Sequence, residues 1–461
     1  ESMNGSKTRQ IKTLYVYELR KIVCRRIVWI TGGIMLLLCV SLSFVDLIST
    51  SSDFGEGNEE IVVSGYEMMK IRRECARALS GRKIDDSLLQ EMQDFSRGEG
   101  MKRESQDVDP ATGIVVSVEP GETDAERGAG AEEETDAKEE TDAEGDGDAK
   151  EEADVKTEPE DIWDRLWAAQ KYTPIRIYVY RIMDYGDGKT MDAAGLYSER
   201  EKLIAQNRED QMLKQEEMEY WKKNDAGLEL PFTYEYAEGW GELWNQSYVV
   251  NCMLLLLLLV SLSNVFSMEH QQKTDAVILC TRHGKRELYI AKVLAGITFG
   301  AAAALLLSGI TLLSDLAVYG ADGFGGALQI EFPLSSWRMS VGESVLVLVF
   351  MLLAISAMYS IVILFLSEWL KKGVSVMAIL VGIMTFTLFI DIPFQLRTLS
   401  QVYDLLPTNL LIPWGLWDDR LFSVFGGYLT QFEAAPVMYA LLSAVLLFLG
   451  RRIWQKQQVG V

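Results

Sequence analysis

Two long apolar runs constrain the fold of this chain more than any other feature of its sequence. They read NCMLLLLLLVSLSNVF at 251–266 and VLVLVFMLLAISAMYSIVILFL at 345–366. A helix of 20 residues rises about 30 Å, which matches the hydrocarbon thickness of a lipid bilayer. A soluble enzyme is therefore excluded, and we expect a mainly α-helical membrane protein. Six membrane spans are predicted, at 27–48, 247–267, 291–314, 343–366, 374–394 and 434–450.

Lys and Arg residues near the ends of these spans predict their orientation. Basic residues are concentrated in 1–26, in the loop 268–290, between the fourth and fifth spans, and in the tail 451–461. A six-span topology places all four segments on the same side of the membrane. Both termini are therefore expected in the cytoplasm, and the region 49–246 is expected outside the cell.

The predicted spans lack ionisable residues near their centres, where such residues usually mark a proton or ion pathway. The ionisable residues that they do contain or adjoin all lie near span ends: Asp46, Lys292, Asp315, Glu343, Glu368 and Asp391. If the protein transports a substrate, we expect a partner to supply the energy. The third span also contains Gly296 and Gly300, whose spacing lets helices approach closely. We interpret these glycines as packing positions within the bundle, with a seam between two copies as the alternative.

The outer region 49–246 is predicted to form an α/β domain. Helical periodicity extends over 65–97, with a break at Gly81. Alternation of apolar and polar residues over 175–182 predicts a strand, and 198–224 is interpreted as one long polar helix.

An acidic tract at 104–161 interrupts this domain and carries 23 acidic but only four basic side chains. It contains too few apolar residues to bury a core, so we predict a disordered linker. The alternative is that it attracts cationic peptides, although salt would screen such attraction beyond about 8–10 Å.

Two cytoplasmic segments have patterns that a simple connector does not need. In 1–26, basic residues flank an apolar helical face, which predicts a helix lying in the membrane interface; that face comprises Ile11, Leu14, Tyr15, Leu19, Ile22 and Val23. A basic flank that only sets topology is the alternative. The loop 268–290 is longer than a helix hairpin requires. We therefore predict that this loop docks a cytoplasmic partner.

The chain offers little for binding a metal or a nucleotide. His270 and His283 are its only histidines and its five cysteines are scattered, so a His/Cys metal site is improbable. The sequence GDGKT at 186–190 resembles the end of a phosphate loop, but Met183 stands where that loop needs glycine. If ATP drives this protein, another subunit must therefore bind it.

Together these features resemble the type-2 ABC transporter permeases (ABC-2 type). The similarity rests on the interfacial helix before the first span, on six spans with both ends inside, and on the stretch EHQQKTDAVILCTRHGKRELYIAK at 269–292. In that family the corresponding loop docks on the ATP-binding subunit. The resemblance implies that the coupling residues are Glu269, Arg282, Lys285, Arg286 and Lys292. The segment 403–433 resembles short helices that such permeases fold back into the outer leaflet.

The resemblance implies the membrane subunit of a bacterial, ATP-driven exporter in the plasma membrane. Two permeases, identical or paralogous, would assemble with two ATP-binding subunits, which would hold the ATP and Mg²⁺. This chain would bind no cofactor and no nucleic acid itself, and it would contact membrane lipid. The expected substrate is an amphipathic molecule such as a peptide or an antibiotic.

One alternative comes from a different class of protein. The chain could be a sensor or immunity protein, which binds an extracellular peptide or a cell-wall precursor and signals without transport. An intramembrane enzyme is less well supported, because no Ser/His arrangement or Asp pair stands within the predicted spans.

Overall fold

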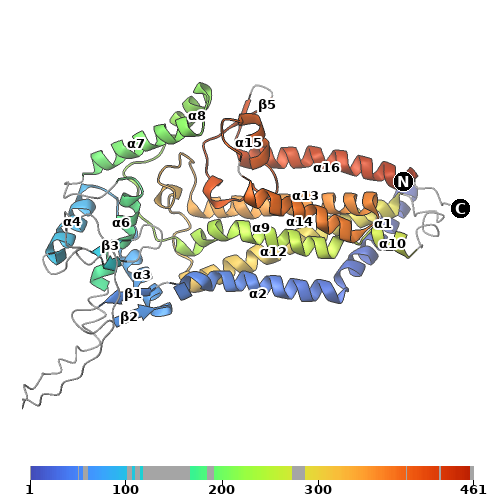
Figure 1. The fold of residues 1–461 in the computed structure, drawn as a ribbon, viewed down its shortest axis with the longest axis horizontal. Coiled ribbons are helices and arrows are strands. Elements are labelled where there is room, and N and C mark those ends of the chain that lie inside the picture. The colour runs from blue at the N-terminus through green and yellow to red at the C-terminus, as the bar shows by residue number, and fades with distance from the viewer. Residues whose placement is uncertain are drawn as a thin grey trace, which may run out of the picture.

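The computed structural model describes most of the chain as a bundle of long helices, with a smaller helical region at one end (Figure 1). The described residues are 2–49, 51–54, 61–100, 106–108, 115–117, 167–183, 192–272, 286–390, 392–424 and 427–456. Five helices are long and apolar enough to cross a membrane. They are α2 (Arg26–Ser49), α9 (Glu238–Leu262), α12 (Glu287–Tyr319), α13 (Val341–Leu370) and α16 (Gln431–Lys456). The prediction of a mainly helical membrane protein is thus confirmed.

The run predicted to span the membrane at 374–394 forms a shorter helix, α14 (Gly373–Phe389), of 17 residues. Such a helix is about 25 Å long, at the lower limit for crossing a bilayer core. A residue beyond the helix holds its last turn in place: the Tyr403 hydroxyl donates a hydrogen bond to the Thr387 carbonyl at 2.8 Å. Pro393, shortly beyond, is incompatible with further helix.

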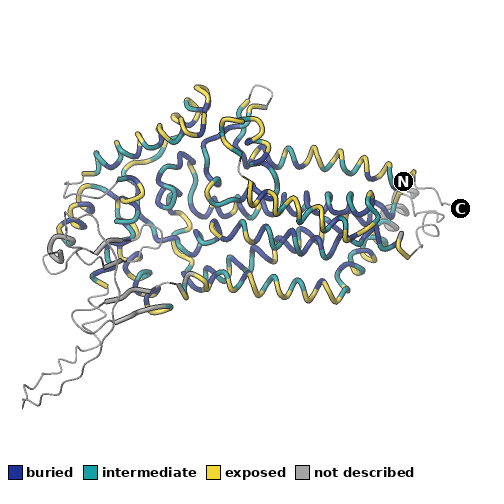
Figure 2. Tube along the Cα trace, in the orientation of Figure 1, coloured by how far each residue is buried: buried dark blue, intermediate teal, exposed yellow. Residues whose placement is uncertain are grey.

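The core of the bundle lies between α9, α12 and α13 (Figure 2). Leu258 on α9, Leu307 on α12 and Leu352 on α13 are all completely buried. In contrast, α2, α14 and α16 expose many large apolar side chains. Exposed apolar surface of this extent is expected where helices face lipid or another subunit.

The N-terminal helix and the end of α16 lie together at one end of the bundle, which we call the terminal end (Figure 1). Here the N-terminal helix α1 (Ser2–Val23) and the short helix α10 (Ser267–Gln271) approach the start of α12. The predicted N-terminal helix is therefore present. Its buried residues include Ile22 and an acidic residue, Glu18.

The opposite end carries the region between α2 and α9, and the described part of this region is mainly helical. Helices α3 (Tyr66–Leu79) and α4 (Asp86–Gly100) confirm the periodicity predicted over 65–97. The predicted break is also present: Gly81 has φ +85°, a left-handed conformation that glycine adopts without strain. The described strands form two short antiparallel hairpins, β1–β2 (Ser51–Phe54 with Ile61–Ser64) and β3–β4 (Gln106–Val108 with Val115–Ser117).

The prediction of an α/β domain was wrong, because the segment read as a strand at 175–182 is helical. It forms α6 (Thr173–Tyr180), with Pro174 in its first turn, where proline is compatible with a helix. Its buried residues are Ile175, Tyr178, Val179 and Ile182. These residues are spaced three or four positions apart, as expected for one face of a helix. The same segment also alternates apolar and polar residues, and this alternation led to the prediction of a strand.

The single helix predicted over 198–224 is two helices, α7 (Ala193–Asp210) and α8 (Gln215–Asp225). The break between them includes Met212, whose φ of +56° is left-handed. The acidic tract predicted at 104–161 lies outside the described residues, apart from β3 and β4.

Buried charged residues attach α7 and α8 to the loops of the bundle. The Arg200 guanidinium donates to the carbonyls of Pro333 (2.7 Å) and Ser335 (3.1 Å) and to Asp225 (2.9 Å). The Arg208 Nε atom donates to Asp419 at 2.8 Å. Three of these four acceptors belong to loops of the bundle that lie more than 100 residues away in the sequence. These contacts therefore hold α7 against the bundle.

The segment 390–430 completes this outer end. It contains α15 (Arg397–Asp404), the 3₁₀ turn η2 (Pro413–Gly415) and the hairpin β5–β6 (Phe422–Val424 with Gly427–Leu429). Arg397 forms an ion pair with the buried Glu217 of α8. The part predicted to fold back into the outer leaflet, 403–433, is joined to the outer helices by the contact between its Asp419 and Arg208 of α7.

The Asp419 contact makes a pH dependence of stability testable. Burial raises the pKa of the Asp419 carboxyl to about 6, although hydrogen bonding and charge from Arg208 act in the opposite direction. Because an unfolded Asp has a pKa near 3.9, the folded state holds this proton more tightly, so stability falls as pH rises from about 4 to about 6. From pH 5 to pH 7.5 we expect Asp419 to reduce the free energy of unfolding by about 1 kcal/mol.

The measurement is thermal unfolding of the purified protein at both pH values, for the wild type and for Asp419→Asn. The drop in unfolding midpoint between pH 5 and pH 7.5 should be smaller in the variant, because its amide does not ionise. Equal drops in the two proteins would show that Asp419 is not the group responsible.

Candidate functional site

Three segments that are distant in sequence bring charged side chains together at the terminal end of the bundle. Glu18 lies on α1, Glu269 on α10, and Lys292 in the second turn of α12. All three are buried, and Lys292 is completely so. Helix α1 passes beside the start of α12, and α10 follows directly after α9, so both acidic residues reach the same lysine.

Lys292 is the centre of this arrangement. Its Nζ atom lies 2.7 Å from Glu269 Oε1 and 3.6 Å from Glu18 Oε2. The ammonium also donates to the Val265 carbonyl at 2.8 Å, and it lies 5.0 Å from the centre of the Phe266 ring. A hydrogen-bonded ammonium of this kind has little freedom to move independently of its partners.

A second lysine balances the charge. Lys21, one helical turn after Glu18, lies 3.2 Å from Glu269 Oε1 and 3.8 Å from Glu18 Oε2. Its side chain is 30% exposed, so it forms the solvent-facing edge of the group. We call Glu18, Lys21, Glu269 and Lys292 the buried charge cluster. It contains two acids and two bases, so its formal charges cancel.

A buried charge cluster contributes specificity more reliably than it contributes stability. Removing ions from water costs several kcal/mol each, and their mutual attraction recovers that cost only in good geometry. An apolar contact would hold α1 against α12 equally well. We therefore infer that the charges define one relative position of α1, α10 and α12.

A further carboxylate, Glu368, lies near the cluster on the last turn of α13. It is buried, and within the described part of the chain neither of its oxygens has a hydrogen-bond partner. Lys292 and Lys371 are close enough to act on it electrostatically. A methyl group added at Gly450 of α16 would lie 3.4 Å from Glu368 Oε2, so α16 covers this carboxylate.

The structure brings two of the predicted coupling residues, Glu269 and Lys292, into direct contact. Arg286 is exposed and immediately precedes α12. Arg282 and Lys285 lie outside the described residues, as does most of the predicted docking loop. These three positions therefore remain predictions.

Gly296 and Gly300 of α12 face another helix of the same chain. A Cβ atom at Gly296 would lie 2.6 Å from Leu364, and one at Gly300 would lie 3.2 Å from the Ser356 carbonyl. Both contacts are made by α13. The close approach of α12 and α13 is thus possible only because these positions lack a side chain.

Sequence reasoning missed Glu18 as a member of the site, although a signal for it was present. The apolar face of the N-terminal helix includes Leu14 and Ile22, and Glu18 lies midway between them on that same face. An acidic residue within an apolar stripe indicates a buried partner of opposite charge. Lys21 is one of the basic residues of 1–26, from which only the orientation of the spans was predicted.

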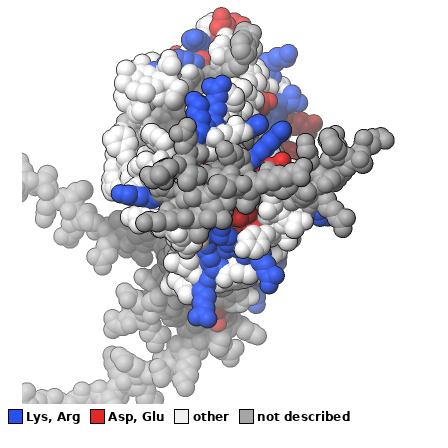
Figure 3. Space-filling model, turned by 90° about the vertical axis from the view of Figure 1, so that its right-hand side faces the viewer, with Lys and Arg blue, Asp and Glu red and all other residues white. Residues whose placement is uncertain are grey.

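The surface around the cluster is basic. Figure 3 shows Lys and Arg side chains spread over the terminal end, with Asp and Glu at only a few places. Exposed basic residues here come from four helices or their edges, and include Arg20, Arg286, Lys372, Arg451 and Arg452. This distribution agrees with the orientation rule, in which basic residues remain in the cytoplasm.

The arrangement is suited to transmitting force between helices. Among the residues that the structure describes, no group of three or more His, Cys, Asp or Glu side chains could hold a metal ion. The cluster joins an N-terminal helix, the beginning of a loop and a long apolar helix. Displacement of any one of these segments would therefore displace the others.

Comparison of the chain with protein-family models, with curated proteins and with solved structures finds no match.

Proposed function

We propose that this chain is the membrane subunit of an ATP-driven bacterial exporter. In this proposal α14 is a sixth, short span, and the terminal end faces the cytoplasm. Two such subunits would assemble with two ATP-binding subunits, which would bind ATP and Mg²⁺. The observation that carries the proposal is the buried charge cluster, because it links the start of the predicted docking loop to two further helices.

The cluster suggests how movement of the ATP-binding subunits would reach the membrane helices. Those subunits would contact the loop 268–290, which begins at α10. Glu269 of α10 holds Lys292 of α12 at 2.7 Å, and Lys292 lies 3.6 Å from Glu18 of α1. A shift of the loop would then move α1 and α12 as a unit. Coupling to transport requires that the substrate bind the two resulting states with different affinities.

The contact with the ATP-binding subunit can be tested by charge reversal. In the variant Arg282→Glu/Arg286→Glu, we expect co-purification of the ATP-binding subunit to be lost, because two cations on the docking surface become anions. The measurement is affinity purification of the tagged protein in mild detergent after co-expression with its neighbouring genes. Bound proteins are then identified by mass spectrometry.

The matched control is Arg451→Glu/Arg452→Glu, which makes the same change of charge at the same end of the bundle. It should retain the ATP-binding subunit, because α16 lies outside the proposed docking surface. If the wild type reproducibly purifies without an ATP-binding subunit, the exporter proposal is wrong. If both charge-reversed variants retain it, the ATP-binding subunit docks elsewhere.

A further inference from the structure

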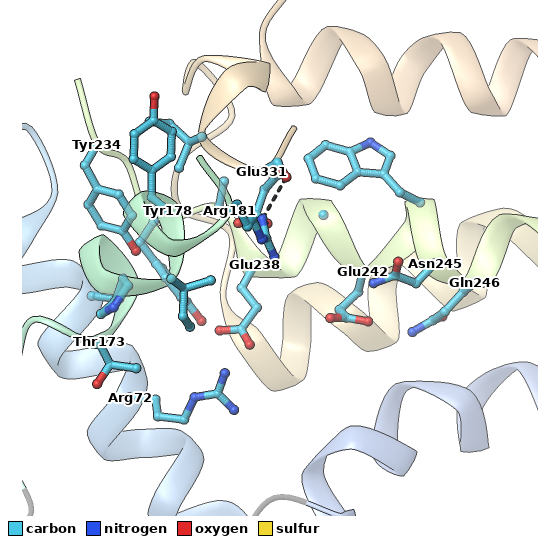
Figure 4. A pocket seen from close by; sticks show the side chains of 18 of the residues that line it. Arg72, Thr173, Tyr178, Arg181, Tyr234, Glu238, Glu242, Asn245, Gln246 and Glu331 are labelled. Carbon is cyan, nitrogen blue, oxygen red and sulfur yellow. Dashed lines mark hydrogen bonds and ion pairs between the residues drawn. The ribbon is translucent and has the colours of Figure 1, made fainter. Parts of the chain in front are cut away.

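A cavity lies at the opposite end of the bundle, where the outer helices meet the membrane helices (Figure 4). It encloses about 500 Å³ and is lined by residues of α2, α3, α6 and α9, and by Ile330 and Glu331 at the 3₁₀ turn η1 (Leu328–Ile330). A volume of this size accommodates a small molecule. The cavity is separate from the buried charge cluster, which lies at the terminal end.

Three polar side chains in the cavity wall have buried atoms without a hydrogen-bond partner among the described residues. They are both amide atoms of Gln170, the Tyr178 hydroxyl and the Gln246 Oε1 atom. Gln170 and Tyr178 are each only 1% exposed. Leaving such a group unpaired destabilises the folded state, because the group has lost its hydrogen bonds to water. Three such side chains in one cavity wall offer hydrogen-bonding groups to a polar ligand.

The charged residues of the wall give the cavity a net negative charge. It is lined by three carboxylates and two guanidinium groups, namely Glu238, Glu242, Glu331, Arg72 and Arg181. Arg181 is already paired with Glu331 at 3.3 Å. Figure 4 shows Glu238 and Glu242 extending from α9 toward the side of the cavity where Arg72 lies. With three carboxylates and two guanidinium groups, the wall as a whole favours a cationic ligand over an anionic one.

One edge of the cavity is apolar and faces outward. Val45 of α2 is 58% exposed and Val249 of α9 is 36% exposed, and both line the cavity. These two helices are candidate membrane spans. An apolar group could therefore enter beside α2 from the lipid, while a polar group reaches the carboxylates and the unpaired amide and hydroxyl groups.

We propose that this cavity binds an amphipathic molecule with an ammonium group attached to an apolar body. The ammonium group lies by Glu238 and Glu242, the ligand's other polar atoms bond to Gln170 and Tyr178, and its apolar body contacts Val45 and Val249. The site belongs to this chain alone. It is thus independent of ATP-driven export and would serve a transporter or a sensor equally.

The test is equilibrium binding to the purified full-length protein in lipid nanodiscs. Octylamine, octanol and octanoate serve as probes, because they share an apolar chain and differ in charge. Octylamine should bind most tightly and octanoate most weakly. In Glu238→Gln/Glu242→Gln, octylamine affinity should fall about tenfold or more, since a hydrogen bond to a charged group contributes about 1.5–3 kcal/mol. Octanol affinity should not change.

Glu219→Gln is the matched control, because Glu219 is exposed on α8 outside the cavity. It should bind octylamine as the wild type does. If the double variant does not fold, the single variants Glu238→Gln and Glu242→Gln provide the same comparison. A second variant, Ile177→Trp, fills the cavity and should weaken binding of octylamine and octanol alike. Octanoate binding as tightly as octylamine, or octylamine affinity unchanged in the double variant, would overturn the proposal.

Two sources could supply such a ligand, and competition distinguishes them. Displacement of octylamine by phosphatidylethanolamine in the nanodisc would assign the site to a lipid headgroup. Displacement by an aliphatic dipeptide amide would assign it to a soluble amine. Either result supports the proposed chemistry and identifies its source.

Discussion

Replacing Lys292 by methionine is expected to lower the free energy of unfolding by about 3–5 kcal/mol, because it leaves buried carboxylates without their central cation. Glu269 loses a partner at 2.7 Å, Glu18 loses one at 3.6 Å, and the Val265 carbonyl loses a donor. Methionine fills much of the volume of lysine, so the loss reflects charge more than packing. The measurement is the midpoint of thermal unfolding in detergent, followed by tryptophan fluorescence.

Two further variants separate this effect from a general loss of basic residues. Lys372→Met removes an exposed cation at the same end of the bundle and should change the midpoint little. Lys292→Met/Glu269→Gln removes both members of the closest pair and should recover part of the lost stability, as a double-mutant cycle would show. An effect of Lys292→Met no larger than that of Lys372→Met would mean that the cluster does not hold these helices together.

Lys21→Met provides a graded comparison within the cluster. Lys21 contacts the same two carboxylates, but at 3.2 and 3.8 Å and with a partly exposed side chain. Water can replace part of its interaction, so its loss should cost less than the loss of Lys292. We therefore expect Lys21→Met to lower the midpoint of unfolding less than Lys292→Met does, because Lys21 is more exposed and lies farther from the carboxylates.

The membrane helices could be predicted from sequence because length and apolar composition suffice to define them. The span predicted at 343–366 corresponds to α13, Val341–Leu370, and the prediction missed only two residues at its start and four at its end. Those ends depend on local contacts. At the start of α13, Ser340 and Glu343 cap the helix through reciprocal hydrogen bonds of 3.2 and 2.8 Å.

The outer helices were harder to predict, because each is half-buried against partners that are distant in sequence. In α6, residues 175–182 fit both a strand and a helix, and the choice between them depends on the surroundings of Tyr178. The break between α7 and α8 has no proline or glycine to mark it. Instead, Leu213 and Trp221 are buried against the bundle.

In the candidate site, too, some residues could be identified from the sequence, whereas contacts between distant segments could not. Glu269 and Lys292 were identified through the resemblance to a family, but the contact between them was not predicted. Glu18 lies more than 200 residues from either, and only the docking of α1 against α12 reveals the contact. The cavity at the other end was not predictable in this way. Its wall combines residues from α2, α3, α6 and α9, and none of them forms a local motif.

Replacing Arg200 by methionine should also cost about 3–5 kcal/mol, because it removes a buried cation that donates hydrogen bonds to three acceptors. It joins α7 to the Pro333 and Ser335 carbonyls and to Asp225. Arg200→Lys keeps the charge but should restore only part of the stability. A lysine ammonium cannot reproduce the planar fork that reaches acceptors in different directions.

The region that loses hydrogen-exchange protection distinguishes the Arg200 contact from the buried charge cluster. Hydrogen exchange should show weaker protection of α7 in Arg200→Met, with little change at the α1–α12 contact. Lys202→Met, on the same helix, is the matched control: its ion pair with Glu199 is 2.7 Å long, but the lysine is 69% exposed. Exposed pairs contribute less than about 1 kcal/mol, so protection should be unchanged. If Arg200→Met instead weakened protection throughout the bundle, the outer helices and the membrane helices would unfold as one cooperative unit.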